Sequence, residues 1–148
     1  MTTKAPNRIP SIKAVMTPFP WKVRLDDPLS HATAVMRERN IRHLPVTDGD
    51  QLVGIVTEHD IGLVENAVGD SRENASLKVR DACAIDAYVV DLSAPLDRVL
   101  AEMAERHIGS VLVAKRGKLA GIFTSSDACH HFGRFLAQFF DSGGDDVA

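Results

Sequence analysis

The pattern G-I-x-T-x-x-D occurs twice in this chain of 148 residues, from Gly54 to Asp60 and from Gly121 to Asp127. Each copy leads from aliphatic residues, typical of a strand, into a stretch typical of a helix N-terminus. Free N–H groups and the dipole at such a terminus attract a phosphate. The Thr hydroxyl can donate a hydrogen bond to that phosphate, and the Asp carboxylate can accept bonds from two ribose hydroxyls. The pattern is therefore compatible with a nucleotide site.

The same T-x-x-D spacing also has a purely structural interpretation. A Thr at the N-cap and an acidic residue three positions later form a capping box, in which the two residues satisfy backbone N–H groups at the start of a helix without any ligand. For a single occurrence this interpretation is the more common one. The pattern by itself leaves both interpretations open.

An internal repeat explains why the pattern occurs twice. Residues 12–61 align with residues 79–128 without a gap, at an offset of 67 positions, and fifteen of the fifty aligned pairs are identical. Self-similarity of this extent indicates two copies of one structural unit. Whatever role the motif has in one unit is therefore expected at the equivalent place in the other.

Each copy predicts the element order β-α-β-β-α. Residues 21–25 and 88–92 have the composition of a strand, and a Pro a few positions later marks the start of a helix, with Asp27 as the expected N-cap before Pro28. Two short apolar runs then flank a tight polar turn, as in a β-hairpin, and a second helix follows. Because about fifty residues bury too little core to fold alone, we expect the two units to pack together with pseudo-two-fold symmetry.

The predicted fold class is therefore α+β, with two such repeats. We expect the first repeat to span residues 8–65, a polar linker to span residues 66–77, and the second repeat, with an extended C-terminal helix, to span residues 78–141. The remaining residues, 142–148, have the composition of a disordered tail. Equivalent residues of the two copies are expected to face each other across a shared cleft.

The first copy resembles a cystathionine β-synthase (CBS) domain. The resemblance lies in M-T-P at residues 16–18, M-R-E-R-N-I-R-H-L-P-V at residues 36–46 and L-V-G-I-V-T-E-H-D at residues 52–60. The second copy resembles a more diverged CBS domain. A tandem CBS pair, or Bateman module, implies a regulatory unit with two related clefts for an adenosyl ligand such as AMP, ADP, ATP or S-adenosylmethionine. Since such a pair is not itself an enzyme, the resemblance implies no catalytic residues.

The resemblance also implies roles for individual residues. In the family the Thr contacts a phosphate and the Asp holds the ribose, while the base lies against the loop before the first strand and against the second strand. The first cleft then takes Thr17, Pro18, Arg42, His43, Leu44, Pro45, Thr57 and Asp60, and the second takes Ala84, Ile85, Ser110, Val111, Thr124 and Asp127.

The two clefts differ in charge. Arg42 and His43 fall where many family members place basic residues that reach the phosphates, whereas their counterparts Gly109 and Ser110 carry no charge. Arg42 can donate two hydrogen bonds to a phosphate and His43 one. We therefore expect unequal clefts, with Arg42 neutralising a phosphate in the first, and weaker binding in the second, where C-A-I replaces M-T-P. The alternatives are a solvated Arg42 and a His43 that is only a satisfied polar residue.

Composition and motif searches argue against other classes of protein. The net charge of -3 is not clustered, which argues against nucleic-acid binding. No apolar run approaches the roughly 20 residues that span a bilayer, and the N-terminus lacks a signal-peptide core, so we expect a cytoplasmic protein without membrane contact. We expect buried thiols at Cys83 and Cys129. Cys129, His130 and His131 would point about 100° apart around a helix, so we expect no metal site and no obligatory cofactor.

An apolar stripe is predicted close to the C-terminus. Phe132, Phe135, Leu136, Phe139 and Phe140 follow the i, i+3, i+4, i+7, i+8 spacing of one helix face. The stripe either packs against the core of its own chain or forms the contact of a homodimer. The sequence favours neither of the two.

Two functions remain open at this point. In the first, a stand-alone regulatory CBS pair binds an adenosyl ligand in the clefts between its repeats and signals to a separate effector protein, whose identity the sequence does not reveal. In the second, the chain is a ligand-independent dimerisation or scaffold module, in which T-x-x-D is only a capping box.

Overall fold

The structure, a computed structural model, describes residues 7–140. The predicted disordered tail, residues 142–148, lies outside the described residues, as does residue 141. In the first half of the chain the elements are η1 (Ile12–Ala14), β1 (Thr17–Pro18), β2 (Val23–Arg24), α1 (Leu29–Arg39), β3 (His43–Asp48), β4 (Gln51–Thr57), α2 (Glu58–Val68) and α3 (Ser71–Asn74). In the second half they are η2 (Val79–Asp81), β5 (Val89–Asp91), α4 (Leu96–Arg106), β6 (Ser110–Lys115), β7 (Lys118–Thr124) and α5 (Ser125–Phe139).

The element order confirms the predicted β-α-β-β-α unit in both copies. In the first copy, β2 pairs in parallel with β3, and β3 and β4 form an antiparallel hairpin. In the second copy β5, β6 and β7 repeat this arrangement. The strand register shifts after Val46 in one hairpin and after Val113 in the other, at positions 67 residues apart. The repeat in sequence is therefore a repeat in structure down to the irregularity of its hairpin.

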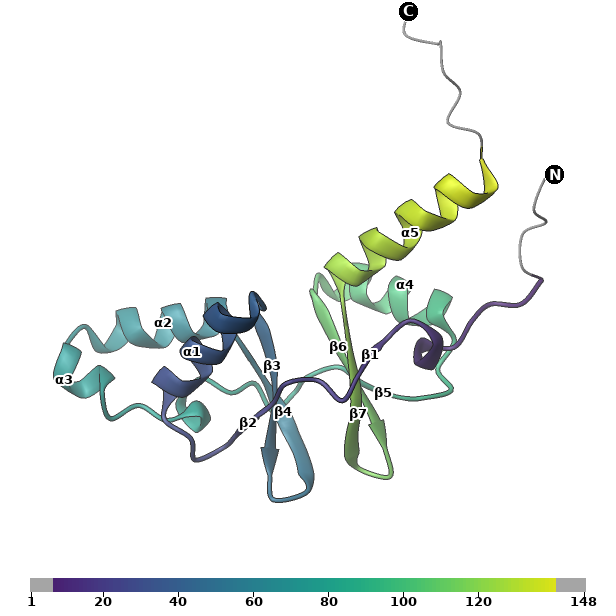
Figure 1. The fold of residues 1–148 in the computed structure, drawn as a ribbon. Helices are drawn as coiled ribbons and strands as arrows, with labels where there is room; N and C mark the ends of the chain where they lie inside the picture. The colour runs from purple at the N-terminus through teal and green to yellow at the C-terminus, as the bar shows by residue number, and fades with distance from the viewer. Residues whose placement is uncertain (1–6, 141–148) are drawn as a thin grey trace, which may run out of the picture.

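The two sheets pack against each other at the centre of the molecule. Ile55 of β4 and Ile122 of β7 are equivalent residues of the two copies, and both are buried together with Leu112 of β6. Figure 1 shows the helices α1 and α2 on the outer side of one sheet, and α4 and α5 on that of the other. This arrangement confirms the predicted pseudo-symmetric packing.

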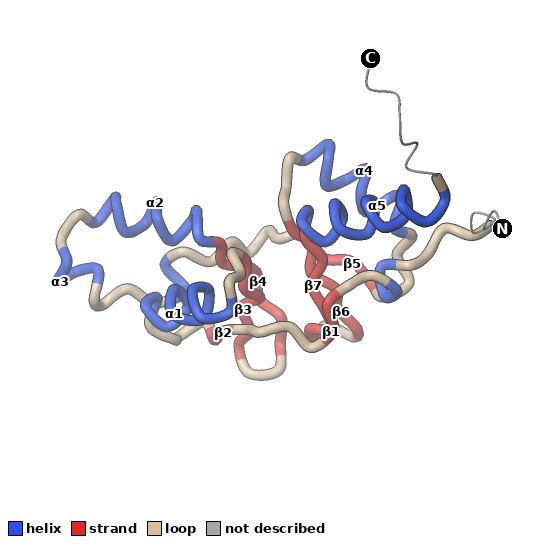
Figure 2. Tube along the Cα trace, turned by 45° about the horizontal axis from the view of Figure 1, so that its top comes forward, coloured by secondary structure: helices blue, strands red, loops and turns tan. Residues whose placement is uncertain are grey.

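The segment before the first strand of each copy packs on the other copy. β1 pairs with β7 of the second sheet, with Thr17 opposite Ile122, and Figure 2 shows it at the edge of that sheet. Ile12 of η1 is fully buried in the second core, and its N–H donates to the Ala94 carbonyl at 2.8 Å. The N-terminal residues of the first sequence repeat are thus structural residues of the second unit.

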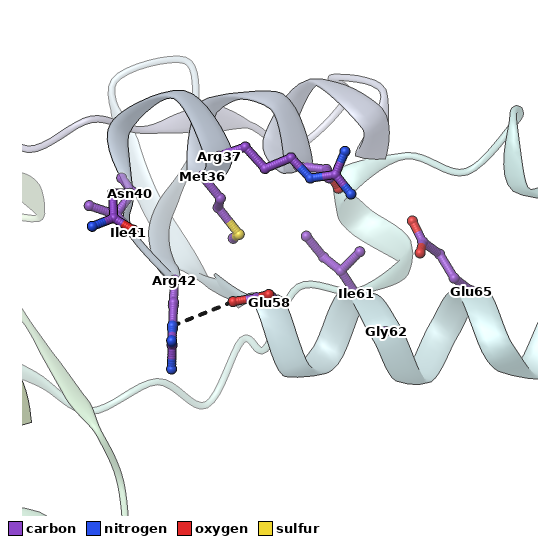
Figure 3. A pocket seen from close by; sticks show the side chains of 10 residues that line it. Met36, Arg37, Asn40, Ile41, Arg42, Glu58, Ile61, Gly62 and Glu65 are labelled. Carbon is purple, nitrogen blue, oxygen red and sulfur yellow. Dashed lines mark ion pairs between the residues drawn. The ribbon is translucent and has the colours of Figure 1, made fainter.

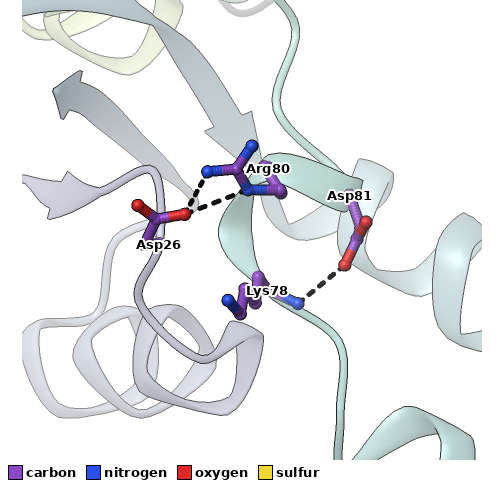
Figure 4. Close-up of polar contacts among 4 residues, drawn as sticks. All are labelled: Asp26, Lys78, Arg80 and Asp81. Carbon is purple, nitrogen blue, oxygen red and sulfur yellow. Dashed lines mark hydrogen bonds and ion pairs between the residues drawn. The ribbon is translucent and has the colours of Figure 1, made fainter.

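The reciprocal exchange occurs in the second repeat. Val79 of η2 is fully buried in the core of the first unit, and its N–H donates to the Asp27 carbonyl at 2.9 Å. Next to it, Arg80 forms an ion pair with Asp26, as Figure 4 shows. The Arg80 hydrogen bond holds the pKa of Asp26 below its usual value. Because both side chains are exposed, the burial of Val79 contributes more to this contact than the ion pair does.

Two local details differ from the sequence-based expectations. Asp27 is not the N-cap of α1, because Pro28 occupies that position in an extended conformation, and the Asp27 carboxylate instead accepts a bond from Arg24 N–H at 2.8 Å. The residues expected to form a linker, 66–77, include the last turn of α2 and all of α3. The exchange of segments also means that the packing units do not coincide with the sequence repeats.

We predict that Gly54→Ala destabilises the protein. A methyl group on Gly54 would overlap the carbonyl oxygen of Ala84 and lie 3.1 Å from Cys83 Sγ. This carbonyl belongs to the backbone and accepts a hydrogen bond from Ile55 N–H at 3.0 Å. Moving it away from the methyl group would break that bond. Forced overlap in a packed region costs about 1–3 kcal/mol, measurable as a lower free energy of unfolding in urea.

Gly62→Ala is the matched control for this substitution. A methyl group on Gly62, inside α2, meets nothing within 4 Å, and Ala is favoured over Gly in a helix by about 1 kcal/mol. The control should therefore be neutral or stabilising. Equal effects of the two substitutions would contradict the close approach at Gly54.

Candidate functional site

A cleft of about 910 Å³ opens where the two repeats meet. We call it the first cleft, because the first T-x-x-D motif lies in its wall. Its lining comes from the start of β3, from the β4–α2 junction with the first turns of α2, and from the connection between α4 and β6. The lining residues are Arg42, His43, Thr57, Glu58, His59, Asp60, Gly62, Leu63, Asn66, His107 and Gly109.

The first cleft brings together four of the predicted site residues, namely Arg42, His43, Thr57 and Asp60. Leu44 and Pro45 do not line it. Leu44 is fully buried in the first core, and Pro45 is buried in the strand beside it. In the second copy, Val111 is likewise fully buried in a core. These β3 and β6 residues therefore belong to the packed interior and not to the lining of the first cleft.

The two loops predicted to contact the base of the ligand each pair with a strand of the other repeat. Thr17 and Pro18 pair with Ile122 and Gly121, on the strand that leads into the second motif. Ala84 forms its bridge with Ile55, on the strand that leads into the first motif. Each loop thus pairs with the strand of the other repeat, whereas the sequence-based grouping placed Thr17 and Pro18 with the first motif.

The environment of Cys83 also indicates that its loop packs against the first repeat. Burial raises the pKa of its thiol, and the negative charge of Asp60 raises the pKa further. Residues 83 and 84 therefore lie near the first motif, whereas Ile85 is largely exposed. The expectation of two buried thiols is wrong in detail, since Cys83 is half-buried and Cys129 is exposed.

The two T-x-x-D motifs differ in how they use the aspartate. At the second motif, Asp127 accepts hydrogen bonds from Thr124 N–H at 2.9 Å and from Thr124 Oγ1 at 3.0 Å, and Asp127 N–H donates back to that hydroxyl. This is a complete capping box. At the first motif, the bond that forms is from Asp60 N–H to Thr57 Oγ1, at 3.1 Å. Within residues 7–140, no corresponding bond from Thr57 to the Asp60 carboxylate is present.

An ion pair stands at the edge of the first cleft. Arg42 Nε lies 3.7 Å from Glu58 Oε2, and 83% and 68% of the two side chains are exposed. Figure 3 shows the pair from a neighbouring pocket of about 410 Å³ between α1 and α2, which Arg42 and Glu58 also line. At this exposure the pair is weak, so the Arg42 guanidinium can leave Glu58 for a stronger partner.

His43 lies deeper in the first cleft. Burial lowers the pKa of its imidazole, and the positive charge of Arg42 lowers it further, while Asp60 partly opposes the shift. Its Nδ1 is buried without a hydrogen-bond partner among the described residues. A buried polar atom without a partner is uncommon in a folded protein.

The equivalent positions of the second copy carry no charge. Gly109 and Ser125 stand where the first copy has Arg42 and Glu58, and Ser125 N–H donates to the Gly109 carbonyl at 2.9 Å, as Glu58 N–H does to that of Arg42. A side chain on Gly109 would begin 3.5 Å from His43 Cε1. The backbone is therefore conserved between the copies, and the small residue leaves room for the imidazole of the other repeat.

Seven residues that line the first cleft were not predicted for it from the sequence, and three of them, Glu58, His59 and His107, have ionisable side chains. Glu58 and His59 lie between the Thr and the Asp of the motif, so their position was visible in the sequence. His107 comes from the second repeat, where it ends α4 in a left-handed conformation with φ of 53°. Only the packing of the two repeats brings it to the first cleft.

His130 and His131 of α5 do not line the first cleft. The rings of His130 and His131 on α5 are 6.0 Å apart, and within residues 7–140 no three His, Cys, Asp or Glu side chains gather as a metal ion would require. Among the same residues, no helix has both the length and the apolar character needed to cross a membrane.

Comparison with known proteins identifies the family. The family model of the CBS domain matches residues 12–61 and 79–134. This chain belongs to the CBS domain family. A curated relative, the uncharacterised protein YlbB of Bacillus subtilis, is 35% identical over 118 residues, which cover 78% of each chain. The resemblance to a tandem CBS pair is thereby confirmed.

Solved CBS structures share this fold. A structure of the acetoin utilisation protein AcuB of Vibrio cholerae superposes with a TM-score of 0.79 at 24% identity, covering 88% of this chain and 95% of that one. The CBS domain pair of protein MJ0100, solved with 5′-methylthioadenosine and S-adenosyl-L-methionine, gives 0.73 at 25% identity, covering 84% and 100%. CBSX2, solved with AMP, gives 0.73 at 23% identity, covering 84% and 97%.

We predict that His43 makes the stability of this CBS pair depend on pH. Since the pKa of His43 in the folded state lies below its ordinary value of 6.5, the unfolded state binds more protons between the two values. The stability is fully present above pH 6.5 and falls as the pH drops below it. His43→Gln should remove this part of the loss, so its melting temperature should decline less between pH 7.5 and 5.5.

The control is His31→Gln, which replaces an exposed histidine on α1. This variant should follow the wild-type pH profile. Parallel profiles of the wild type and His43→Gln would show that the imidazole of His43 is not what titrates.

Proposed function

We propose that this CBS pair is a regulatory module that binds an adenosyl ligand in the first cleft and transmits its occupancy to a separate effector protein. The observation that carries the proposal is the difference between the two aspartates. Asp127 is engaged in a capping box, whereas the Asp60 carboxylate faces the first cleft without that partner. A carboxylate in this position can accept hydrogen bonds from the two hydroxyls of a ribose.

Side chains of the first cleft, more than backbone groups, could bind a phosphate group of such a ligand. Two of the first N–H groups of α2 already have partners, because Glu58 N–H donates to the Arg42 carbonyl and Asp60 N–H to Thr57 Oγ1. A phosphate would therefore depend on side chains more than on a row of backbone amides. Arg42 and the Thr57 hydroxyl, which both line the first cleft, are the groups that can hold it.

The solved relatives support the ligand class. MJ0100 binds 5′-methylthioadenosine and S-adenosyl-L-methionine through its CBS pair, and CBSX2 binds AMP. The ligands have an adenosyl group in common and differ in what is attached to it. We propose that the first cleft of this chain accepts the same adenosyl group, and that the second T-x-x-D motif, where neutral Gly109 and Ser110 stand at the positions of Arg42 and His43, binds more weakly.

We predict that AMP or S-adenosylmethionine raises the melting temperature of this protein. Ligand at about 100 times its dissociation constant stabilises the folded state by nearly 3 kcal/mol. Asp60→Ala should abolish this binding, measured by calorimetry, with little change in the stability of the free protein. If no adenosyl compound bound, or if Asp60→Ala bound as tightly as the wild type, the proposal would be wrong.

Asp127→Ala is the matched control, because it removes the equivalent carboxylate of the second copy. Loss of its capping box should lower the free energy of unfolding by about 1 kcal/mol. Binding to the first cleft should persist in this variant. The pair of variants thus separates a ligand-binding aspartate from a helix-capping one.

A second candidate function, dimerisation, is favoured by helix α5. None of its fifteen residues is buried, and Figure 1 shows it extending away from the second sheet. On α5, Phe132 is 61% exposed and Phe135 and Leu136 are also exposed. Phe140, 62% exposed, directly follows the helix in an extended conformation, so the prediction that it continues the helix face is wrong. An apolar face of this kind is typical of a surface that contacts another molecule. We propose a second copy of the chain as its partner, in a homodimer.

We predict that the double substitution Phe132→Asp and Phe140→Asp converts a dimer into a monomer. Two charges in an apolar contact are strongly unfavourable, and light scattering coupled to gel filtration would report the mass. The control is Phe19→Asp, which changes an exposed phenylalanine outside α5. A monomeric wild type, or a dimer that survives the double substitution, would exclude this contact.

A further inference from the structure

Three histidines, His43, His59 and His107, line the first cleft together with charged side chains. Its lining includes one permanent cation, Arg42, two carboxylates, Glu58 and Asp60, and three imidazoles. With the imidazoles neutral, the formal charge of the lining is +1 − 2 = −1. Each proton taken up by an imidazole makes this charge more positive, so the sign of the cleft depends on pH.

The three imidazoles do not contribute equally. His43 is half-buried, and its burial and the charge of Arg42 both oppose its protonation. His59 and His107 line the same cleft but are exposed to solvent. His59 lies at the start of α2, and His107 faces the cleft from the second repeat.

The groups around these two histidines define their electrostatic environment. The charged side chains of the cleft are Glu58 and Asp60 on α2 and Arg42 at the start of β3. The Cys83 thiol next to Asp60 has a raised pKa and is neutral at physiological pH. Because Glu58 partly compensates Arg42 at 3.7 Å, the cleft offers a phosphate little net positive charge until an imidazole is protonated.

The possible adenosyl ligands carry opposite charges at the position next to the ribose. A phosphate group there is an anion, whereas the sulfonium of S-adenosylmethionine is a cation. Positive charge in the cleft therefore favours the first class and disfavours the second. Protonation of the lining would move the two affinities in opposite directions.

We propose that His59 and His107 are specificity-determining residues of the first cleft, which make it favour phosphorylated over sulfonium adenosyl ligands as the pH falls. The inference rests on the proposed function, since it concerns the choice between ligands of the same site. The contribution of His107 means that this choice depends on both repeats.

The residues at equivalent positions of the two copies provide conservative substitutions for a test. The counterpart of His107 in the first copy is Asn40, which adopts the same left-handed conformation with φ of 53°, so His107→Asn removes the titrating group and keeps a residue suited to that backbone. The counterpart of His59 is Ser126, so His59→Ser also uses a residue that this fold accepts at that position.

The experiment is calorimetric titration of the wild type and of the double variant His59→Ser, His107→Asn with AMP, S-adenosylmethionine and uncharged adenosine at pH 6, 7 and 8. Uptake of one proton on binding changes an affinity by up to about tenfold per pH unit. The preference of the wild type for AMP over S-adenosylmethionine should rise at least tenfold from pH 8 to pH 6. In the double variant this rise should fall to about threefold or less, and the affinity for uncharged adenosine should vary little with pH in either protein.

Comparing the two proteins with the same ligand cancels the titration of AMP itself. His31→Asn, outside the cleft, should keep the full wild-type pH dependence. If the double variant retained the wild-type change in preference, the inference would be wrong while the proposed function stood. If none of the three ligands bound at any pH, the proposed function would fall, and this inference with it.

Discussion

The close approach of Gly54 to the carbonyl of Ala84 is the contact on which the arrangement of the two repeats depends. A strand of one repeat and a loop of the other share a short antiparallel bridge there, between Ile55 and Ala84. Gly121 has the equivalent contact, with Met16 and Thr17 of the other repeat. Only a residue without a side chain permits two backbones to come this close, so the glycine of the G-I-x-T-x-x-D motif serves the packing of the repeats.

This exchange of segments also decides how the clefts are built. The loop with Cys83 and Ala84 belongs to the second repeat in sequence but lies beside the first T-x-x-D motif. The first cleft is composite as well, because His107 and Gly109 of the second repeat line it together with residues of the first. A ligand that binds across such a boundary can change the relative position of the repeats if its affinity differs between the two arrangements. The proposed regulatory role would have its physical basis there.

The two copies use one motif in two ways. At the second motif the carboxylate of Asp127 completes the helix cap, and the neighbouring positions hold Gly109 and Ser125. At the first, the carboxylate of Asp60 faces a cleft with Arg42, Glu58 and three histidines. The helical geometry is the same in both, so the difference lies in the side chains and in which partners they reach. Divergence of the copies has separated a structural role from one suited to binding a ligand.

The sequence by itself determined the repeat, the β-α-β-β-α order of each unit and the asymmetry between Arg42 and Gly109, because periodicity, turn composition and identity at a fixed offset are local properties of the chain. The prediction that Asp27 is the N-cap of α1 is wrong, because the backbone conformation around Asp27 and Pro28 decides which of them takes that position. The exchange of the loops, the presence of His107 in the first cleft and the different bonding of Asp60 and Asp127 were decided only by the tertiary structure. These features depend on contacts between residues far apart in the chain. No local sequence pattern indicates against which repeat a segment packs.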